Sequence, residues 1–399
     1  MKPALGLGTP IGMSNRLKNH CDTHALAACV ALTLVIFVVL GASVEAQTLT
    51  TLYSFTGGSD GGYPDAGVVV DKAGNLYGTT PYGGSSYNGV VFQVSPSGAE
   101  TILYDFGFAD GANPYTPVIR DYSGNLYGTT WDGGASGQGT VYMIDTTGTH
   151  TVLHNFAGGT TDGCGPEGSL VMDKYGSLYG TTWNCGARNY GTVFKLGKNG
   201  AYGLLHSFSG RDGAYPDASL ILDTLGNVYG VTSGGGSASA GVVYKLTKRG
   251  IEVLHAFSGA TDGCSPSGTP AMDKAGNLYG TTSGNGCSSN GTVWRVSQKG
   301  VETILHSFAG GTADGCNPYG GVVGDSKGNA YGNTSSCGAY NSGTLWELSG
   351  PTLSLLHSFA GSDGFFPSGD LRRDSNGVLY GTTRNGGTND VGTVWSYVP

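Results

Sequence analysis

The stretch GSLYGTTWNCG, residues 176–186, is the key to the sequence because close variants of it recur along the chain. The tyrosines at the equivalent position are Tyr77, Tyr127, Tyr179, Tyr229, Tyr279, Tyr331 and Tyr380. They are 50, 52, 50, 50, 52 and 49 residues apart. A fixed period near 50 residues indicates a repeat architecture in which each repeat is one supersecondary unit.

Each repeat contains the same parts in the same order. A glycine-rich loop with Asp-Gly and then Pro precedes a short apolar strand, as in residues 169–173. A tight turn leads to the LYGTT strand, a variable glycine-rich loop follows, and two further strands complete the repeat, as in residues 191–195 and 204–208. The period of two residues and the turn residues predict four strands per repeat, and no helical period is found after residue 46.

Seven four-stranded repeats predict an all-β fold, a single seven-bladed β-propeller formed by residues 47–399. The two ends of the sequence support a closed ring. Residues 48–55 (TLTTLYSF) read as a lone fourth strand, and residues 392–398 (GTVWSYV) read as a third strand that lacks its fourth. Together the two segments complete one blade, so we expect the ring to be closed by pairing of the N-terminal and C-terminal strands.

Composition excludes several other classes of protein. The chain has 399 residues, of which 73 are glycine, but no strict Gly-x-y triplet runs through it, so it is not collagen-like. The net charge is -8, and lysine and arginine do not cluster, so the sequence lacks the basic surface of a nucleic-acid-binding protein.

The first 46 residues differ in character from the rest. A basic flank precedes the apolar run of residues 25–42, and Ser43-Val44-Glu45-Ala46 follows it. This order predicts a secretory signal peptide cleaved after Ala46, with an uncleaved membrane anchor as the alternative. Either way residues 47–399 are expected to be secreted, periplasmic or on the cell surface, in an oxidising compartment. No contact with a membrane is expected beyond the leader.

The repeats resemble those of a known family. The segments GNLYGTTPYGG (residues 74–84), GTVFKL (191–196) and TILHSF (303–308) are similar to the GloVer repeats, named after Gloeobacter and Verrucomicrobia, of secreted bacterial proteins. The resemblance covers the chain from Leu52 onward and implies an exported repeat protein with no established activity. Members often carry a C-terminal anchoring segment; this sequence ends at Pro399 without one, so C-terminal anchoring is not expected. The kelch repeat is a more distant likeness that implies only the propeller geometry.

The long loops are expected to lie on one face of the ring. Connections alternate between the two faces of a propeller, and the first and third connections of each repeat are short. The DGxxP loop and the loop after LYGTT are long and variable, so they share the other face. Because loops carry function more often than strands do, this face is the candidate binding surface.

Residues that recur in every repeat are expected to support the scaffold. Aspartates accept backbone hydrogen bonds in turns, and we give this role to two sets of seven, with metal ligands or general acids as the alternative. A set of five histidines and the large aromatic residues of the third strand are expected to pack inside the blades, although a metal role for the histidines is the alternative. The sets are Asp60, Asp110, Asp162, Asp212, Asp262, Asp314 and Asp363; Asp71, Asp121, Asp173, Asp223, Asp273, Asp325 and Asp374; His154, His206, His255, His306 and His357.

The residue after the loop proline varies between repeats and precedes the innermost strand. The seven such residues should therefore converge at the axial opening on the loop-rich face, where they are either a ligand site or an ordinary polar rim. They are Asp65, Tyr115, Glu167, Asp217, Ser267, Tyr319 and Ser368. No motif requires a cofactor, but Asp65, Glu167 and Asp217 are candidate ligands for calcium. Trp131 and Trp183, at equivalent positions in the variable loops, either bind a sugar or a protein or pack against their own loops.

Two functions remain open. The first is a binding or structural module, expected to be a monomer, whose loop-rich face contacts an extracellular glycan or protein. The second is a propeller enzyme acting on polysaccharides, either a lyase or a glycoside hydrolase, which needs carboxylates with divergent pKa values. Residues 47–399 hold only five glutamates and no recognisable catalytic motif, so binding is favoured.

Six cysteines recur in pairs. Three repeats carry one cysteine in the DGxxP loop and one in the variable loop, and the other four repeats carry neither. This covariation selects one pairing of the fifteen that six cysteines allow. We expect disulfides between Cys164 and Cys185, Cys264 and Cys287, and Cys316 and Cys337.

Overall fold

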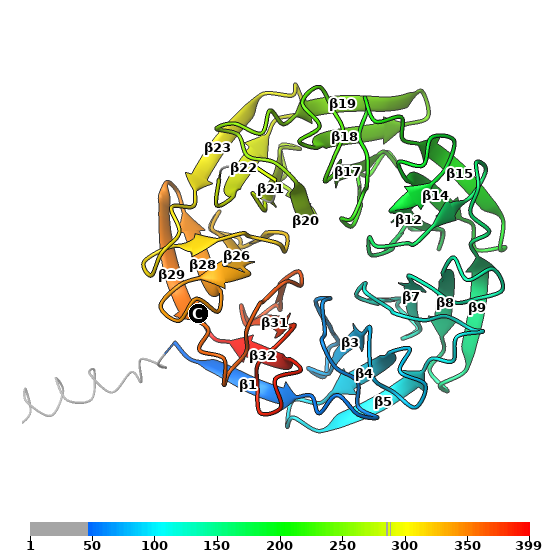
Figure 1. Ribbon diagram of the computed structural model, residues 1–399, viewed down its shortest axis with the longest axis horizontal. Helices are drawn as coiled ribbons and strands as arrows, with labels where there is room; N and C mark the ends of the chain where they lie inside the picture. The colour runs from blue at the N-terminus through cyan, green and yellow to red at the C-terminus, as the bar shows by residue number, and fades with distance from the viewer. Residues whose placement is uncertain (1–46, 285, 288) are drawn as a thin grey trace, which may run out of the picture. The chain divides into compact units, whose positions relative to one another are not determined.

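Seven four-stranded antiparallel sheets make up the part of the chain that the computed structural model describes, residues 47–284, 286, 287 and 289–399. The sheets are arranged as a closed ring, which confirms the predicted propeller (Figure 1). In these residues every regular element is a strand, and none is a helix long and apolar enough to cross a membrane. The predicted leader, residues 1–46, lies outside the described residues.

The blades are numbered in chain order and written from the inner to the outer strand. Blade 1 consists of β2 (Val69–Val70), β3 (Leu76–Thr80), β4 (Val90–Val94) and β5 (Glu100–Asp105). Blade 2 consists of β6 (Ile119–Arg120), β7 (Leu126–Thr130), β8 (Thr140–Ile144) and β9 (His150–Asn155). Blade 3 consists of β11 (Val171–Met172), β12 (Leu178–Thr182), β14 (Thr192–Leu196) and β15 (Tyr202–Ser207). Blade 4 consists of β16 (Ile221–Leu222), β17 (Val228–Thr232), β18 (Val242–Thr247) and β19 (Gly250–Ala256). Blade 5 consists of β20 (Pro266–Met272), β21 (Leu278–Thr282), β22 (Thr292–Val296) and β23 (Glu302–Ser307). Blade 6 consists of β25 (Val323–Gly324), β26 (Ala330–Thr334), β28 (Thr344–Ser349) and β29 (Thr352–Ser358).

Blade 7 joins the two ends of the described chain. It consists of β30 (Arg372–Arg373), β31 (Leu379–Thr383), β32 (Thr393–Tyr397) and β1 (Leu49–Ser54). The outer strand β1 pairs antiparallel with β32, with Leu49 opposite Tyr397 and Ser54 opposite Thr393. The predicted closure of the ring is confirmed: β32 pairs with β31 on one side and with β1 on the other, so the C-terminal strand has no unpaired edge.

The core lies between adjacent sheets and depends on one large residue per blade. The third-strand aromatic residues are at most 1% exposed, as expected: Phe92, Tyr142, Phe194, Tyr244, Trp294, Trp346 and Trp395. Each one packs over the glycine of a LYGTT-type strand. A Cβ atom on Gly180, for example, would lie 2.6 Å from the Phe194 ring. The repeated glycine therefore makes room for the core aromatic residue.

The repeated aspartates and histidines act as scaffold. In each short turn an aspartate accepts backbone hydrogen bonds, as Asp173 does from Tyr175 N and Ser177 N, both at 2.9 Å. The loop aspartates lie beside the histidines, as His206 Nε2 does at 3.1 Å from Asp212 Oδ2. These contacts fix the turn and the start of the long loop, which is the structural role that the sequence indicated.

The two long loops of a blade meet on one face. The structure contains the three predicted disulfides, Cys164–Cys185, Cys264–Cys287 and Cys316–Cys337, with Cα–Cα distances of 5.5, 6.3 and 5.4 Å. Short ladders accompany two of them, formed by β10 (Gly163–Cys164) with β13 (Asn184–Cys185) and by β24 (Gly315–Cys316) with β27 (Ser336–Cys337). The four blades without cysteines hold the same loops together with single bridges, such as Ala112 opposite Asp132.

Candidate functional site

The seven DGxxP loops end around the axis of the ring and enclose a cavity of about 330 Å³. All seven residues predicted to converge there line the cavity: Asp65, Tyr115, Glu167, Asp217, Ser267, Tyr319 and Ser368. Phe366, Asp370 and Arg384 line it too. The cavity therefore combines the three predicted carboxylates and that of Asp370 with hydroxyl groups, aromatic rings and one guanidinium.

Local backbone geometry holds each lining residue in place. The residue before the loop proline has a left-handed conformation, with φ of 58° at Tyr63, 58° at Tyr215 and 61° at Phe366. Its N–H donates to the variable loop of the preceding blade, as Tyr215 N does to Tyr190 O at 3.0 Å. Because every loop is tied to its neighbour in this way, the residue after the proline is presented to the cavity by a fixed turn.

Of the three predicted carboxylates in the cavity, Asp65 has a cationic partner. Arg384 Nε lies 3.5 Å from Asp65 Oδ1, and Ser368 Oγ donates to the same oxygen at 3.2 Å. Burial nevertheless outweighs both contacts and raises the pKa of Asp65 to about 6. At neutral pH this group is largely ionised.

Glu167 and Asp217 hold their protons more strongly. Burial, together with the charges of Asp217 and Asp65, raises the pKa of Glu167 to about 8. Burial raises the pKa of Asp217 to about 7, and its Oδ1 atom has no hydrogen-bond partner among the described residues. Near neutral pH the cavity therefore offers both protonated carboxyl groups, which can donate, and carboxylates, which can accept. Strongly shifted pKa values in a cavity are typical of functional sites.

Two hydroxyl groups add hydrogen-bonding capacity. Ser267 is 4% exposed, and its Oγ has no partner within the described part of the chain. Tyr319 is 39% exposed as a whole, but desolvation of its hydroxyl at the cavity, together with the charges of the nearby carboxylates, raises the pKa of that hydroxyl, so it stays a neutral donor. Both side chains can donate to or accept from a polar ligand in the cavity.

The candidate calcium ligands do not form a compact cage. Among the described residues, the group of three histidine, cysteine or acidic side chains whose ligand atoms lie within 4.8 Å of one another is His255, Asp262 and Glu302. Asp65, Glu167 and Asp217 share the axial cavity without meeting that distance. A calcium ion there would need water ligands or a closer approach of the three carboxylates, and calcium binding stays a prediction.

An arc of aromatic rings runs across blades 1 to 4 and meets the cavity at Tyr115. Neighbouring ring centroids along it are 5.9, 6.2, 6.2, 6.4, 5.2 and 5.8 Å apart. We call it the aromatic arc; its members in spatial order are Tyr63, Tyr82, Tyr115, Trp131, Trp183, Tyr215 and Tyr190.

Tyr115 belongs to both the cavity and the aromatic arc. Its hydroxyl lies 2.7 Å from that of Tyr82. Trp131 and Trp183 are half-buried and pack on the DGxxP loops of the following blades: the Trp131 ring lies 3.2 Å from the position of a Cβ on Gly165, and Trp183 stacks on Tyr215. Each tryptophan thus packs on the loop of the next blade and not, as the sequence had suggested, on its own loop, and binding of a sugar or a protein by these residues stays a prediction.

Comparison with known proteins agrees with the repeat pattern. The profile of the Gloeobacter/Verrucomicrobia repeat family matches residues 38–194 and 171–395, which together span most of the chain. The chain belongs to this family. The resemblance expected from the sequence is thereby confirmed. No curated protein matches the chain.

Solved structures similar to this Gloeobacter/Verrucomicrobia repeat protein share its fold. A streptogramin B lyase is 12% identical with a TM-score of 0.59, over 88% of this chain and 97% of the other. Virginiamycin B lyase from Staphylococcus aureus is 12% identical with a TM-score of 0.58, over 88% and 99%. The extracellular domain of a hybrid two-component system of B. thetaiotaomicron is 13% identical with a TM-score of 0.57, over 88% of this chain and 41% of the other. At these identities the likeness extends to the propeller alone.

Several site residues of this repeat family protein were missed by sequence reasoning. Arg384 occupies the position that Trp131 and Trp183 hold in their own repeats, directly after the two threonines, so its departure from the pattern was a usable signal. Asp370 stands where other repeats have Gly, Pro, Ser or Thr. It accepts hydrogen bonds from Gly321 N at 2.6 Å and Thr269 N at 3.1 Å. Asp370 therefore ties blades 5, 6 and 7 together at the cavity wall.

Proposed function

We propose that this protein is an exported carbohydrate-binding module whose ligand lies along the aromatic arc and enters the axial cavity. The observation that carries the proposal is the continuity of the two features through Tyr115, which lines the cavity and contacts both Tyr82 and Trp131. Accessible aromatic faces suit the apolar faces of sugar rings, and convergent polar groups suit their hydroxyls.

The charge of the cavity favours a neutral sugar. Asp65 is largely ionised at neutral pH and is offset by Arg384, while the raised pKa values keep Glu167 and Asp217 substantially protonated. An acidic sugar would bring another negative charge to a buried group of carboxylates that has a single guanidinium beside it. Its desolvation would not be offset, so neutral hexoses or pentoses are the better ligands.

Export is supported by the disulfides. Three disulfides are typical of proteins that work in an oxidising compartment, outside the cytosol. One of the similar solved structures is described as an extracellular domain, which agrees with this location. A ligand found outside the cell, such as a polysaccharide, fits both observations.

A glycan array probed with the purified chain, with and without calcium, tests the proposal. We expect binding to neutral oligosaccharides, and we expect the double variant Asp65→Ala/Asp217→Ala to lose most of it. Glu252→Ala, which removes an exposed carboxylate from the outer strand β19, is the matched control and should bind normally. Retention of full binding by the double variant would show that the axial cavity takes no part.

An enzyme acting on polysaccharides is the second candidate, and the pKa values of the cavity carboxylates favour it. Glu167, with a pKa raised to about 8, could donate a proton at neutral pH, while ionised Asp65 could stabilise positive charge. Release of reducing ends from neutral polysaccharides distinguishes the two functions. Turnover by the wild type that Glu167→Gln abolishes, with binding retained, would establish the enzyme in place of the binding module.

A further inference from the structure

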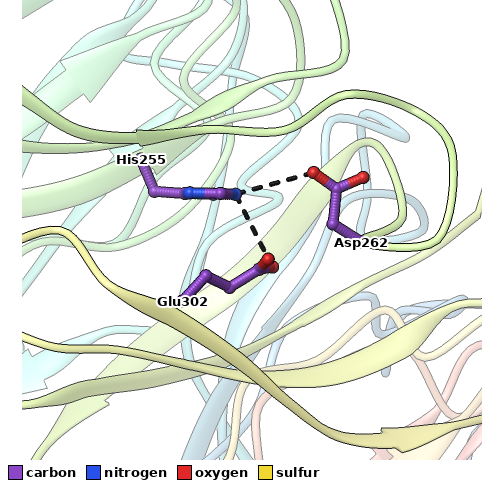
Figure 2. Close-up of side chains that lie close together, drawn as sticks. All are labelled: His255, Asp262 and Glu302. Carbon is purple, nitrogen blue, oxygen red and sulfur yellow. Dashed lines mark ion pairs between the residues drawn. The ribbon is translucent and has the colours of Figure 1, made fainter.

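His255, Asp262 and Glu302 form a compact group (Figure 2), and none of the three lines the axial cavity. His255 belongs to β19 and Glu302 to β23, the outermost strands of blades 4 and 5 (Figure 1), and Asp262 lies in the loop that connects the two blades. His255 Nε2 lies 3.6 Å from Asp262 Oδ2 and 3.6 Å from Glu302 Oε1. All three ligand atoms lie within 4.8 Å of one another.

The other blades supply internal controls for this group. Wherever histidine meets the loop aspartate elsewhere, the two approach more closely: 3.3 Å at His154, 3.1 Å at His206, 3.1 Å at His306 and 2.7 Å at His357. At the position equivalent to Glu302, the blades that follow these histidines carry Tyr202, Ile251, Leu353 and Leu49. Blade 1 carries Glu100 there, but Tyr53 replaces the histidine beside it. Histidine, aspartate and glutamate occur together at the junction of blades 4 and 5. The histidine–aspartate distance there, 3.6 Å, is longer than at the other four histidines.

The group leaves donor and acceptor atoms unused. His255 Nε2 and Glu302 Oε1 are buried and have no hydrogen-bond partner among the described residues. The described residues form no lysine or arginine ion pair with either Asp262 or Glu302. A partly buried group of two carboxylates and an imidazole with no cationic side chain beside it has the chemistry to accept a metal cation.

We propose that His255, Asp262 and Glu302 bind a first-row divalent metal ion of the zinc class. Zinc takes imidazole nitrogen at about 2.0 to 2.1 Å and carboxylate oxygen at about 2.0 to 2.2 Å. Two ligand atoms 3.6 Å apart, each about 2.1 Å from a common ion, subtend an angle of about 118°, so each carboxylate can share an ion with the imidazole at a near-tetrahedral angle. The two carboxylates lie within 4.8 Å of each other and would draw together around the ion. The side chains are 18, 14 and 16% exposed, so water can fill the remaining coordination position. Calcium is disfavoured because it takes oxygen ligands.

The ion would join two blades. Its ligands come from β19, from β23 and from the connecting loop, two residues before Cys264 of the blade 5 disulfide. A metal bound to the folded chain and not to the unfolded chain raises the stability of the fold. Zinc should therefore raise the melting temperature of the protein.

Zinc titration of the tag-free full chain after chelation tests the site, by calorimetry and by thermal melting. We expect one zinc ion per chain, an increase in melting temperature on zinc addition, and no such increase with calcium. Glu302→Gln keeps the size of the side chain and removes a charged ligand, so we expect affinity for zinc to fall by more than about tenfold, the lower bound of what loss of a metal site's supporting partner costs.

Glu100→Gln is the matched control, since Glu100 holds the equivalent position in blade 1, where tyrosine replaces the histidine. It should bind zinc as the wild type does. X-ray absorption of the zinc-loaded wild type gives a readout that needs no variant, and it should show one imidazole in an all-nitrogen-and-oxygen shell. The proposal is overturned if the wild type binds no zinc stoichiometrically, or if Glu302→Gln and Glu100→Gln bind it equally well.

Discussion

Asp217 and Asp223 are six residues apart, yet their pKa values shift in opposite directions. Asp223 accepts hydrogen bonds from Leu225 N and Asn227 N, both at 2.9 Å, and the hydrogen bonds it accepts lower its pKa in spite of partial burial. Asp217 is buried in the axial cavity with one oxygen unpartnered, which raises its pKa to about 7. Asp223 therefore holds a turn, whereas Asp217 is available to a ligand.

Glu167 should make the stability of the protein depend on pH. Its pKa is raised from 4.5 to about 8 in the folded chain, so between these values the folded state holds a proton that the unfolded state has released. The free energy of unfolding therefore falls as pH rises through this window. Urea unfolding at pH 5 and pH 8 should show a smaller loss of stability for Glu167→Gln than for the wild type. An equal loss in both proteins would contradict the assignment of this pKa.

At the scale of elements, the blades are tied together by contacts that each recur seven times. Gly191 has a φ of +89°, and a Cβ there would lie 2.4 Å from Thr182 O and 2.6 Å from the Cδ of Pro216 in the next blade. The same glycine precedes the third strand in every repeat, and the same proline ends the DGxxP motif of every repeat. A close approach of backbone and proline thus fixes each blade against its neighbour.

The disulfides reinforce loops that are already paired. Because cysteine-free blades hold the same loops by backbone bridges, removing one disulfide should lower stability without opening the axial cavity. For Cys316→Ser/Cys337→Ser, which opens a loop of 21 residues, the chain-entropy model predicts a loss of about 3 kcal/mol. Urea unfolding measures the loss, and the glycan array measures retained binding. Loss of binding by this variant while it remains folded would contradict the expected independence of the two.

At the scale of the whole molecule, the sequence predicted what the repeats share. The period placed one variable residue per repeat after the loop proline, so the repeat pattern alone was enough to expect Asp65, Glu167 and Asp217 at the axis, where they lie. The covarying cysteines likewise selected their partners. Both inferences depend only on equivalent positions in similar blades.

Features that depend on contacts between blades could not be predicted in the same way. The aromatic arc joins residues from different positions of the repeat, such as Tyr190 in a variable loop and Tyr215 in the following DGxxP loop. The group around His255 depends on which residue the next blade places opposite it. In six of the seven blades the apolar inner strand is shorter than predicted: residues 169–173 contribute only Val171–Met172 to the ladder, since Ser169 N instead donates to Ser219 Oγ beside the cavity. Blade 5 is the exception, with β20 spanning Pro266–Met272.

The central claim, that a sugar lies along the aromatic arc, is tested most directly by tryptophan fluorescence. The protein has five tryptophans, and Trp294, Trp346 and Trp395 are at most 1% exposed, so a change in emission on adding ligand reports on Trp131 and Trp183. We expect a saturable change with at least one member of a panel of neutral oligosaccharides. Trp131→Ala/Trp183→Ala should weaken that binding by at least about tenfold in calorimetry, since each aromatic contact contributes about 1 kcal/mol.

The control variant is Tyr175→Ala, which removes a 72% exposed aromatic residue from the short turn between β11 and β12 and should bind as the wild type does. The account predicts saturable fluorescence changes in the wild type and in this control, and weakened binding in the tryptophan variant. No saturable change with any member of the panel, or equal affinity in all three proteins, would contradict it.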